Sequence, residues 1–340
     1  MQSDLSRSPE YAGSKDISSA ILDLCDRNLL YQSRLHPIPS FSSQSRKVFV
    51  KREDESGFGI SGYKKRKYAS LIPNLLHTRP KEIIVIGTAF SNHVCGIVQL
   101  LNENHLPYSL WLKESHQLSP KGNWFLTQLL ARPDKIHWIS PEAWKVVDDE
   151  AQKYADIVDH SVFILPEGGS VKEAVAGAAT LSLDLIRNEE EEREEMDHIF
   201  MDLGTGFTAA CTAYMLGAIG KKAHLHFVKI GAPNDDYGQI FDKASTWIES
   251  LTRSTPQLPP ISWHLPVTAK SFGQVNSNLS QFIQEFAREE GILTDPIYSA
   301  KLFMTAKMVM QLQSLKGNCM IIHSGGGVGL LGHSERMRRG

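Results

Sequence analysis

The sequence predicts an α/β protein with mostly parallel sheets, and two observations support this class. Short apolar runs alternate along the chain with segments of helical spacing, and several of these runs end in clusters of glycine, serine or threonine. This alternation is typical of parallel strands joined by crossover helices. The 340 residues are enough for two smaller cores on either side of a cleft, and we expect two.

The elements are predicted in order from the N-terminus. Residues 1 to about 16 are expected to form a loose tail, and KVFVKRED predicts a strand. ESGFGISG then predicts a turn, and a helix is expected to begin near Tyr63. Later strands are predicted over EIIVIG, YSLWL, IHWI, VFIL, IFMDLG, AHLHFVKIG and CMIIHSG. The acidic run NEEEEREEMD (188–197) is interpreted as a solvated helix end and linker.

Composition and charge argue against several classes of protein. The formal charge of -2 gives no reason to expect a nucleic acid partner. No apolar run approaches the roughly 20 residues that span a bilayer, and the polar start does not resemble a signal peptide. We therefore expect a cytoplasmic protein with no membrane partner.

The four cysteines, Cys25, Cys95, Cys211 and Cys319, are widely spread and include no CxxC pair. The last three lie in apolar surroundings and are expected to be buried free thiols. The sequence therefore predicts neither disulfides nor a metal site.

Three loops that follow predicted strands, GTAFSNH, GTGFTAA and HSGGGVG, indicate one composite binding site, and LPEGGS (165–170) is a fourth candidate. Ligands of open α/β sheets bind at the carboxyl ends of the strands, where loops lead into helices. Exposed backbone N–H groups at such positions suit anions. We expect this site to hold a phosphate and a carboxylate.

The GTGFTAA loop fits the dinucleotide pattern G-x-G-x-x-[GA] after a strand. A dinucleotide site would need an acidic residue about 20 positions further on, at the end of the next strand. That strand instead ends with Lys229. Thr205 and Thr208 suit a monophosphate, so a phosphate cup is favoured over a purely structural turn, and a nicotinamide site is the least favoured.

The basic run Lys64–Lys67 lies at the start of a predicted helix, where the helix dipole disfavours cations. A solvated basic face is the default interpretation, and a nuclear signal is a weak alternative. A phosphate held nearby would compensate for the dipole. A desolvated lysine could then have a pKa low enough to form a Schiff base.

Collinear motifs from about residue 30 to 332 resemble those of one family of pyridoxal-phosphate enzymes, the aminocyclopropane-carboxylate deaminases and D-cysteine desulfhydrases. VFVKREDESGFGISGYKKRK resembles the family's strand, K-R-[ED]-D, glycine-rich turn and G-N-K-x-R-K. GTAFSNH resembles G-G-x-Q-S-N-[HQ], and LPEGGS resembles P-x-G-G-S. EGILTDPIYSAK resembles E-G-[IV]-x-x-D-P-[VI]-Y-x-G-K, and HSGGGVGLLG resembles H-T-G-G-x-x-G-L-F. GTGFTAA lies where the family has its phosphate loop.

The resemblance implies a tryptophan-synthase-β-like fold (fold type II) with the active site between two domains. Residues 1–67 and 171–340 would form a large cofactor-binding domain, with residues 68–170 inserted as a small domain. The implied cofactor is pyridoxal 5'-phosphate, the implied substrate is a small amino acid, and relatives suggest a homodimer.

The resemblance also implies roles for individual residues. Lys64 would form the Schiff base, Ser91 and nearby amides would hold the substrate carboxylate, and Tyr298 would act as an acid or base. Asn92 would bond the ring hydroxyl of the cofactor, and Ser299 would face its pyridine nitrogen. The implied cofactor-binding residues are Lys64, Lys67, Asn92, Gly204, Thr205, Gly206, Phe207, Thr208 and Ser299. The implied substrate-binding residues are Ser91, Asn92, His93, Gly169, Phe272 and Tyr298.

Several positions depart from the family pattern. Tyr63 replaces the asparagine before the lysine, Phe90 replaces the glutamine of the Q-S-N loop, and Phe272 lies where a second active-site tyrosine is expected. These changes are expected to affect substrate specificity more than cofactor binding. Ser299 replaces the glutamate of the deaminases, and a neutral hydroxyl there favours β-elimination.

The predicted function is therefore an α,β-eliminating lyase similar to D-cysteine desulfhydrase, which yields pyruvate, ammonia and sulfide. A ring-opening enzyme similar to 1-aminocyclopropane-1-carboxylate deaminase and a catalytically idle cofactor-binding relative remain as alternatives.

Overall fold

The computed structural model describes residues 14–115, 118–231 and 237–337, and its strands form two separate sheets. The larger sheet has the order β1-β2-β10-β7-β8-β9, and every neighbouring pair is parallel except β1 with β2. Its strands are β1 (Leu35–Pro37), β2 (Val48–Lys51), β7 (His198–Leu203), β8 (His224–Lys229), β9 (Ile261–His264) and β10 (Cys319–Ile322). The predicted α/β class with mostly parallel sheets is confirmed.

The smaller sheet has the order β5-β4-β3-β6, and all of its pairs are parallel. Its strands are β3 (Glu82–Gly87), β4 (Tyr108–Lys113), β5 (Ile136–Ile139) and β6 (Val162–Leu165). Alternate residues of β3 face opposite ways: Ile83 and Val85 join the main core, whereas Ile84 and Ile86 join a separate cluster with Ala151. A parallel strand covered on both faces is apolar throughout, which explains why EIIVIG reads as a continuous apolar run.

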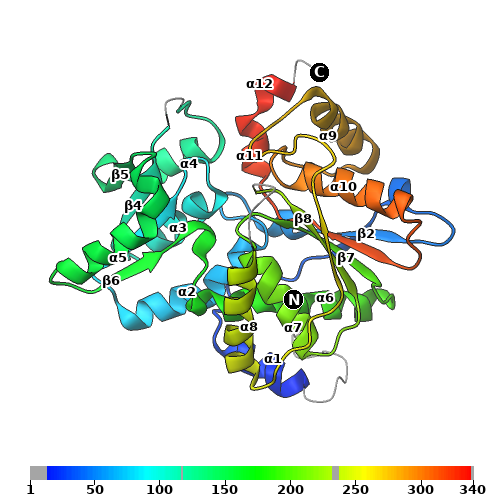
Figure 1. Cartoon of the computed structure of the whole chain (residues 1–340), viewed down its shortest axis with the longest axis horizontal. Coiled ribbons are helices and arrows are strands. Elements are labelled where there is room, and N and C mark those ends of the chain that lie inside the picture. Colours follow the sequence, from blue (N-terminus) through cyan, green and yellow to red (C-terminus); the bar gives the residue numbers. More distant parts are fainter. Residues whose placement is uncertain (1–13, 116–117, 232–236, 338–340) are drawn as a thin grey trace.

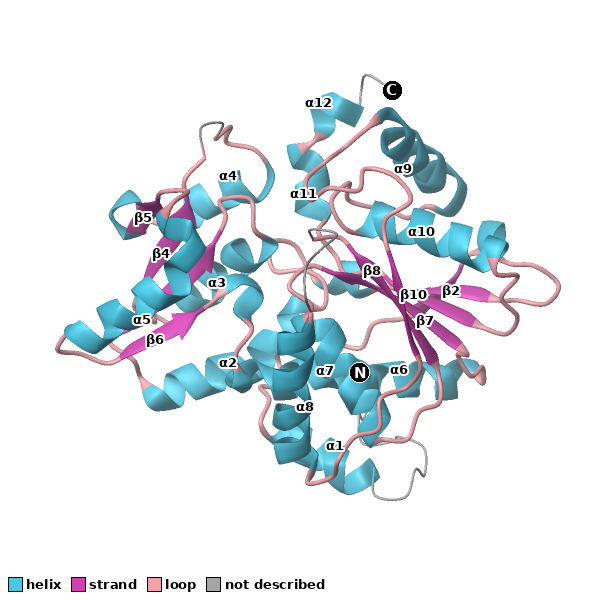
Figure 2. Cartoon of the chain, viewed as in Figure 1, coloured by secondary structure: helices cyan, strands magenta, loops and turns pink. Residues whose placement is uncertain are grey.

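Helices cover both faces of the larger sheet (Figures 1 and 2). On one face α9 and α10 pack through Phe286 and Phe303 onto Val50 and Phe200, and α6 and α7 belong to the main core with Ile199. The helices are α1 (Ser14–Asp23), α2 (Lys64–Thr78), α3 (Asn92–Glu103), α4 (Gly122–Leu130), α5 (Val147–Ile157), α6 (Val175–Glu192), α7 (Phe207–Ala218), α8 (Gly238–Thr252), α9 (Ser277–Glu290), α10 (Ser299–Leu312), α11 (Gly327–Gly332) and α12 (Ser334–Met337). No described helix is both long and apolar enough to cross a membrane.

The smaller sheet lies within residues 68–170, the range predicted for the small domain, and all strands of the larger sheet lie outside it. The predicted boundary at residue 67 falls inside α2, so this helix runs from one predicted domain into the other. The division therefore stays a prediction. Residues 1–13 of the predicted tail lie outside the described residues, and the tail prediction is wrong for residues 14–16, which belong to α1.

The cysteine prediction is confirmed: Cys95, Cys211 and Cys319 are buried free thiols, and Cys25 is a partly buried one. The prediction of a solvated run at 188–197 is wrong for its first residues. Asn188 and Glu189 are buried, and Glu189 forms an ion pair of 2.8 Å with Lys221.

A buried ionic cluster explains part of the basic run at the start of α2. Arg66 is 2% exposed, and its Nε and Nη2 donate to Glu53 at 2.7 and 2.8 Å. Its Nη2 also donates to Asp184 at 2.6 Å, and Lys51 donates to the same carboxylate at 2.7 Å. The interpretation of this run as a solvated face is therefore wrong for Arg66 and for the buried Lys67. The cluster ties the first turn of α2 to β2 and α6.

The interior of α2 contains Pro73, which has no N–H to donate to the Ala69 carbonyl. The backbone N–H of Asp26 donates to that carbonyl instead, at 2.7 Å. The segment after α1 thus supplies the hydrogen bond that the helix cannot make for itself.

Candidate active site

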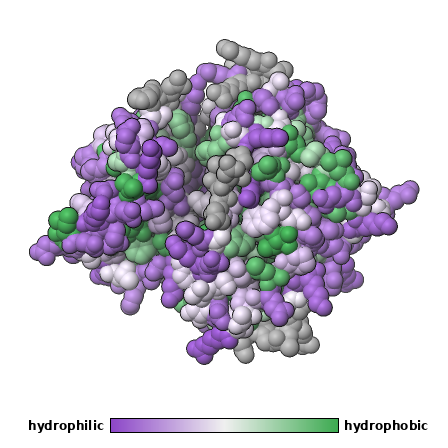
Figure 3. All heavy atoms as spheres, in the orientation of Figure 1, coloured by the Kyte–Doolittle hydropathy of each residue, from purple (hydrophilic) through white to green (hydrophobic). Residues whose placement is uncertain are grey.

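A cavity of about 950 Å³ lies between the two sheets. Loops at the carboxyl ends of strands from both sheets line it, including residues 88–93 after β3, 113–115 after β4, 167–168 after β6 and 204–208 after β7. In Figure 3 the surface is hollowed between the two halves of the molecule. Small-molecule sites usually have volumes of about 300–1,000 Å³, so this cavity can hold a cofactor together with a substrate.

Lys64 is the first residue of α2 and lines the cavity. Its Nζ lies 5.0 Å from the ring centroid of Tyr63 and 5.5 Å from that of Tyr298. Burial lowers the pKa of Lys64, although the carboxylates of Asp202 and Asp295 oppose this shift. A lowered pKa increases the fraction of neutral amine, the form that attacks a carbonyl group.

Asp202 is a cavity residue that the sequence analysis did not select. It is 2% exposed, its Oδ2 accepts from the Tyr63 hydroxyl at 3.2 Å, and its Oδ1 is buried with no hydrogen-bond partner among the described residues. Burial raises the pKa of Asp202, and the charge of Lys64 opposes the shift. The sequence signal was available, because Asp202 is the only carboxylate in the apolar run IFMDLG.

The predicted phosphate loop joins β7 to α7 and lines the cavity from Gly204 to Thr208. Gly206 precedes the helix with a φ of 82°, and a Cβ there would lie 2.6 Å from a Tyr237 ring atom. This position therefore requires glycine. No side chain caps α7, so its first N–H groups have no partner within the helix and suit an anion.

Lys67 lies beside this loop. Its Nζ donates to the Gly168 carbonyl and lies 5.5 Å from the ring centroid of Phe207. Burial, with a smaller contribution from the charge of Lys64, lowers the pKa of Lys67 to about 7. A phosphate in the loop would favour the protonated form of this lysine.

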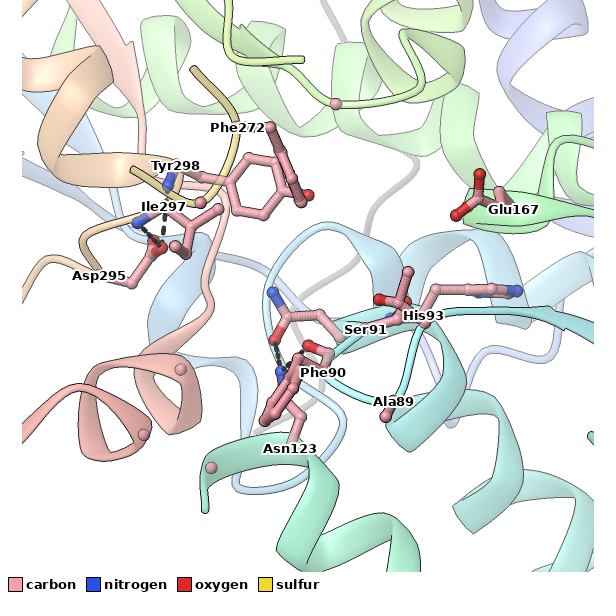
Figure 4. A pocket seen from close by; sticks show the side chains of 18 of the residues that line it. Ala89, Phe90, Ser91, His93, Asn123, Glu167, Phe272, Asp295, Ile297 and Tyr298 are labelled. Carbon is pink, nitrogen blue, oxygen red and sulfur yellow. Dashed lines mark hydrogen bonds between the residues drawn. The ribbon is translucent and has the colours of Figure 1, made fainter. Parts of the chain in front are cut away.

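The loop after β3 forms a second place for an anion, at the start of α3. Ser91 caps this helix, because its Oγ accepts from the N–H groups of His93 and Val94 at 3.1 and 3.3 Å. Asn123, which the sequence analysis did not select, donates to the Phe90 carbonyl at 3.0 Å and to Asn92 Oδ1 at 2.6 Å (Figure 4). The Ser91 hydroxyl proton can still donate to a carboxylate, since the oxygen acts only as acceptor in the cap.

His93 and Gly169 are both predicted to contact the substrate, but only His93 lines the cavity. His93 lines the cavity, its Nδ1 lies 2.9 Å from the Tyr68 hydroxyl, and its buried Nε2 has no partner among the described residues. Gly169 does not line the cavity: a Cβ there would lie 2.7 Å from the His93 ring. Its neighbour Gly168 lines the cavity instead.

Ser299, which is predicted to face the cofactor ring, does not line the cavity. It is fully buried, and its Oγ donates to Asp295 Oδ2 at 2.7 Å. Asp295, which the sequence analysis did not select, lines the cavity, and its Oδ1 accepts from the N–H groups of Ile297 and Tyr298 at 2.8 and 2.9 Å (Figure 4). Asp295 Oδ2 accepts from the N–H and the hydroxyl of Ser299, so both oxygens of this buried carboxylate are engaged within its own turn at the edge of the cavity.

Aromatic side chains line part of the cavity. The Phe272 ring meets the Tyr298 ring edge to face, with centroids 5.9 Å apart, and Phe90 lies on the wall formed by the loop after β3 (Figure 4). Phe272 is 56% exposed and Phe90 is 46% exposed, so both rings are accessible from the cavity. The two departures from the family pattern thus make its walls more apolar.

Comparison with known proteins identifies the family. The family model described as "Pyridoxal-phosphate dependent enzyme" matches residues 27–325. The chain belongs to this family. A putative 1-aminocyclopropane-1-carboxylate deaminase of Pyrococcus abyssi is 26% identical over 298 residues, covering 85% of this chain and 87% of the relative. The mitochondrial bifunctional D-cysteine desulfhydrase/1-aminocyclopropane-1-carboxylate deaminase of Arabidopsis thaliana is 24% identical over 307 residues, covering 85% and 75%.

The fold of this pyridoxal-phosphate-dependent enzyme is also found in solved structures. The crystal structure of an ACC deaminase homologue superposes with a TM-score of 0.82 at 20% identity and covers 95% of this chain and 98% of the homologue. The resemblance inferred from the motifs and the predicted fold type II are confirmed.

The residues around the cavity fit pyridoxal phosphate. The start of α7, the hydroxyls of Thr205 and Thr208 and the ammonium group of Lys67 form a donor set that suits a monophosphate. Lys64 lies in the same cavity with a lowered pKa, as attack on an aldehyde requires. The predicted contact of Asn92 with the ring hydroxyl stays a prediction.

Proposed function

We propose that this pyridoxal-phosphate-dependent enzyme is a lyase that catalyses α,β-elimination of a small amino acid, with D-cysteine as the first candidate. The observation that carries the proposal is the position of Lys64 Nζ, which lies near the Tyr298 ring in a cavity bordered by the uncapped start of α7 and by Ser91 at the start of α3. One helix start would hold the cofactor phosphate and the other the substrate carboxylate.

Each side chain has a role that follows from its position. The start of α3 and the Ser91 hydroxyl would bind the substrate carboxylate and so orient the bonds at Cα. When bound, pyridoxal phosphate supplies an electron sink for the negative charge that develops at Cα. The Lys64 amine, whose lowered pKa favours the neutral form, would accept the α-proton. Burial raises the pKa of Tyr298, so its hydroxyl is protonated at neutral pH and suits a proton donor.

The reaction of D-cysteine balances without a further reactant. The bonds from Cα to its proton, from Cβ to sulfur and from Cα to nitrogen break, and one water molecule supplies the keto oxygen of pyruvate. The products are pyruvate, ammonia and hydrogen sulfide. The apolar rings of Phe90 and Phe272 would contact the departing side chain and exclude bulk water from the reacting carbon.

Ring opening of 1-aminocyclopropane-1-carboxylate is a second candidate, and Asp295 favours it. The preference for elimination rested on a neutral hydroxyl at residue 299, whereas Asp295 and not Ser299 lines the cavity. A carboxylate that reached the pyridine nitrogen would keep it protonated and would strengthen the electron sink, which suits the more demanding reaction. This reaction yields 2-oxobutanoate rather than pyruvate.

The experiment first locates the cofactor and then identifies the keto acid. Borohydride reduction of the purified holoenzyme and peptide mapping should place the pyridoxyl group on Lys64. Lys64→Ala should abolish labelling, whereas Lys65→Ala is the matched control from the same helix turn and should keep it. The holoenzyme is then supplied with D-cysteine, L-cysteine and 1-aminocyclopropane-1-carboxylate, and keto acids are separated by chromatography.

Pyruvate from D-cysteine supports the proposal, and 2-oxobutanoate as the main product supports the second candidate. Label on Lys65 or Lys67 would contradict the assignment of Lys64. A normally labelled holoenzyme that releases no keto acid from any amino acid tested would favour a catalytically idle relative. The expected homodimer also remains a prediction, which light scattering of the purified protein tests.

A further inference from the structure

Four histidines gather on three neighbouring strands of the larger sheet. β7 carries His198, β8 carries His224 and His226, and β9 carries His264. The parallel registers pair His198 with His224 and Val228 with His264. Side chains alternate along a strand, so His224 and His226 lie on the same face of the sheet. None of the four lines the cavity that contains Lys64.

Three of these histidines have the spacing of a metal site. His198, His224 and His226 each offer one ring nitrogen, and these nitrogens all lie within 4.8 Å of one another. His198 Nδ1 and His226 Nε2 are already 3.0 Å apart. Tetrahedral zinc with Zn–N bonds of about 2.0–2.1 Å separates its ligand nitrogens by about 3.3 Å. The pair His198–His226 is therefore already close to the separation that a shared ion requires.

The surrounding groups match those that orient histidine ligands. His226 Nδ1 lies 3.0 Å from His264 Nε2, so it can donate to His264 while Nε2 holds a metal. Ser262 Oγ lies 2.8 Å from His224 Nε2 and can accept from that nitrogen when Nδ1 coordinates. Metal-bound histidines usually donate their second N–H to a neighbouring acceptor in this way.

The burial of the histidines also suits an ion that enters from solvent. His226 is 1% exposed and stacks on Phe200 with ring centroids 4.3 Å apart, whereas His198 and His224 are only partly buried. The deep ligand is thus held rigidly, and the other two leave a path to water. Neutral imidazoles prefer zinc and its transition-metal neighbours over magnesium or calcium.

We propose that His198, His224 and His226 form a binding site for one divalent transition-metal ion of the zinc class, with water completing the coordination. This proposal departs from the expectation of no metal site, which considered cysteine spacing only. It does not depend on the proposed function, because the site lies outside the cavity. An ion there would join β7 to β8 near their amino ends and would raise thermal stability.

The experiment uses tag-free holoenzyme that has been treated with a chelator and dialysed. Zn²⁺ is titrated in a calorimeter, and Co²⁺ is titrated while its visible ligand-field bands are followed. His198→Gln and His224→Gln are the ligand variants, His264→Gln tests the hydrogen-bonding neighbour, and the exposed His137→Gln on β5 is the matched control. Circular dichroism and the cofactor absorbance check that each variant is folded.

The holoenzyme and His137→Gln should bind one Zn²⁺ per chain, raise their melting temperature with it and develop tetrahedral Co²⁺ bands. His264→Gln should bind Zn²⁺ about 10–100-fold more weakly than the unchanged holoenzyme, and the loss of Zn²⁺ affinity should be larger in His198→Gln and His224→Gln. Absence of Zn²⁺ binding by the holoenzyme would overturn the proposal. So would ligand variants that are folded and bind Zn²⁺ as tightly as His137→Gln.

Discussion

Replacing Arg66 by methionine should destabilise the protein far more than replacing an exposed arginine. Arg66 makes three charge-assisted hydrogen bonds of 2.6–2.8 Å to Glu53 and Asp184, and all three side chains are at most 2% exposed. Methionine fills much of the volume of the arginine side chain, but it removes the positive charge that compensates the two carboxylates. Lys51 remains 2.7 Å from Asp184 but is 3.9 Å from Glu53, so Glu53 loses its main partner.

Breaking a buried ion pair from one side costs about 3–5 kcal/mol, because the remaining charge stays in a region of low polarity. We expect the Arg66→Met variant to lose about this much free energy of unfolding. The matched control is Arg132→Met. Arg132 pairs with Asp134 at 3.0 Å, but the two side chains are 81% and 58% exposed. That exposed pair should contribute less than about 1 kcal/mol.

The assay is urea unfolding of each holoenzyme variant, followed by circular dichroism, with the midpoint and slope compared. The double variant Glu53→Met/Arg66→Met removes both members of the pair and should recover much of the loss, since no unpaired carboxylate remains at residue 53. If Arg66→Met lowers stability no more than Arg132→Met, then the cluster does not act as a buried electrostatic unit.

Three further predictions concern the cavity. Tyr298→Phe should keep the cofactor absorbance but lower kcat about 10²–10⁴-fold, because its hydroxyl is proposed to transfer a proton; keto acid release measures this. Phe272→Tyr should raise D-cysteine turnover in the same assay if the lost hydroxyl is what limits activity, and unchanged turnover would exclude that explanation. Affinity for pyridoxine phosphate, which has no aldehyde for Lys64 to attack, should fall as the pH rises above about 7. In the free protein Lys67 loses its proton above this pH, whereas a bound phosphate favours the protonated lysine. Equilibrium dialysis at several pH values should show this dependence of the affinity, and Lys67→Met should remove it.

The strands that carry an apolar run could be predicted from the sequence, including the edge strands β5 and β6 of the smaller sheet, whereas the edge strands β1 and β9 of the larger sheet could not. β3 and β7 are buried on both faces and appear in the sequence as continuous apolar runs. β1 is three residues long and ends in proline, and β9 is a four-residue strand whose side chains are partly exposed. Both lie at the edges of the larger sheet, where one side has no neighbouring strand and the apolar pattern is interrupted.

The candidate site could be predicted where contiguous motifs carry it. Lys64, Ser91 and the loop from Gly204 to Thr208 meet around one cavity, as expected for loops at the carboxyl ends of strands. Asn123 was missed because its role depends on contacts with a segment far away in the chain. Asp202 left a local signal, a carboxylate within an apolar run, but its partner Tyr63 is also far away in the chain. The predicted role of Ser299 stays a prediction: its hydroxyl donates to Asp295, and no linear pattern reveals which of these two polar residues lines the cavity.

The backbone hydrogen bond from the Asp26 N–H to the Ala69 carbonyl connects the segment after α1 to the interior of α2. A fragment that began after Asp26 would retain every residue of the cavity, yet it would leave the Ala69 carbonyl, which faces Pro73, without its donor. An unsatisfied buried carbonyl costs about 1–3 kcal/mol. That loss would fall on the helix that begins with Lys64, so trimming the segment would destabilise the element that places this lysine in the cavity, although none of its described residues lines the cavity.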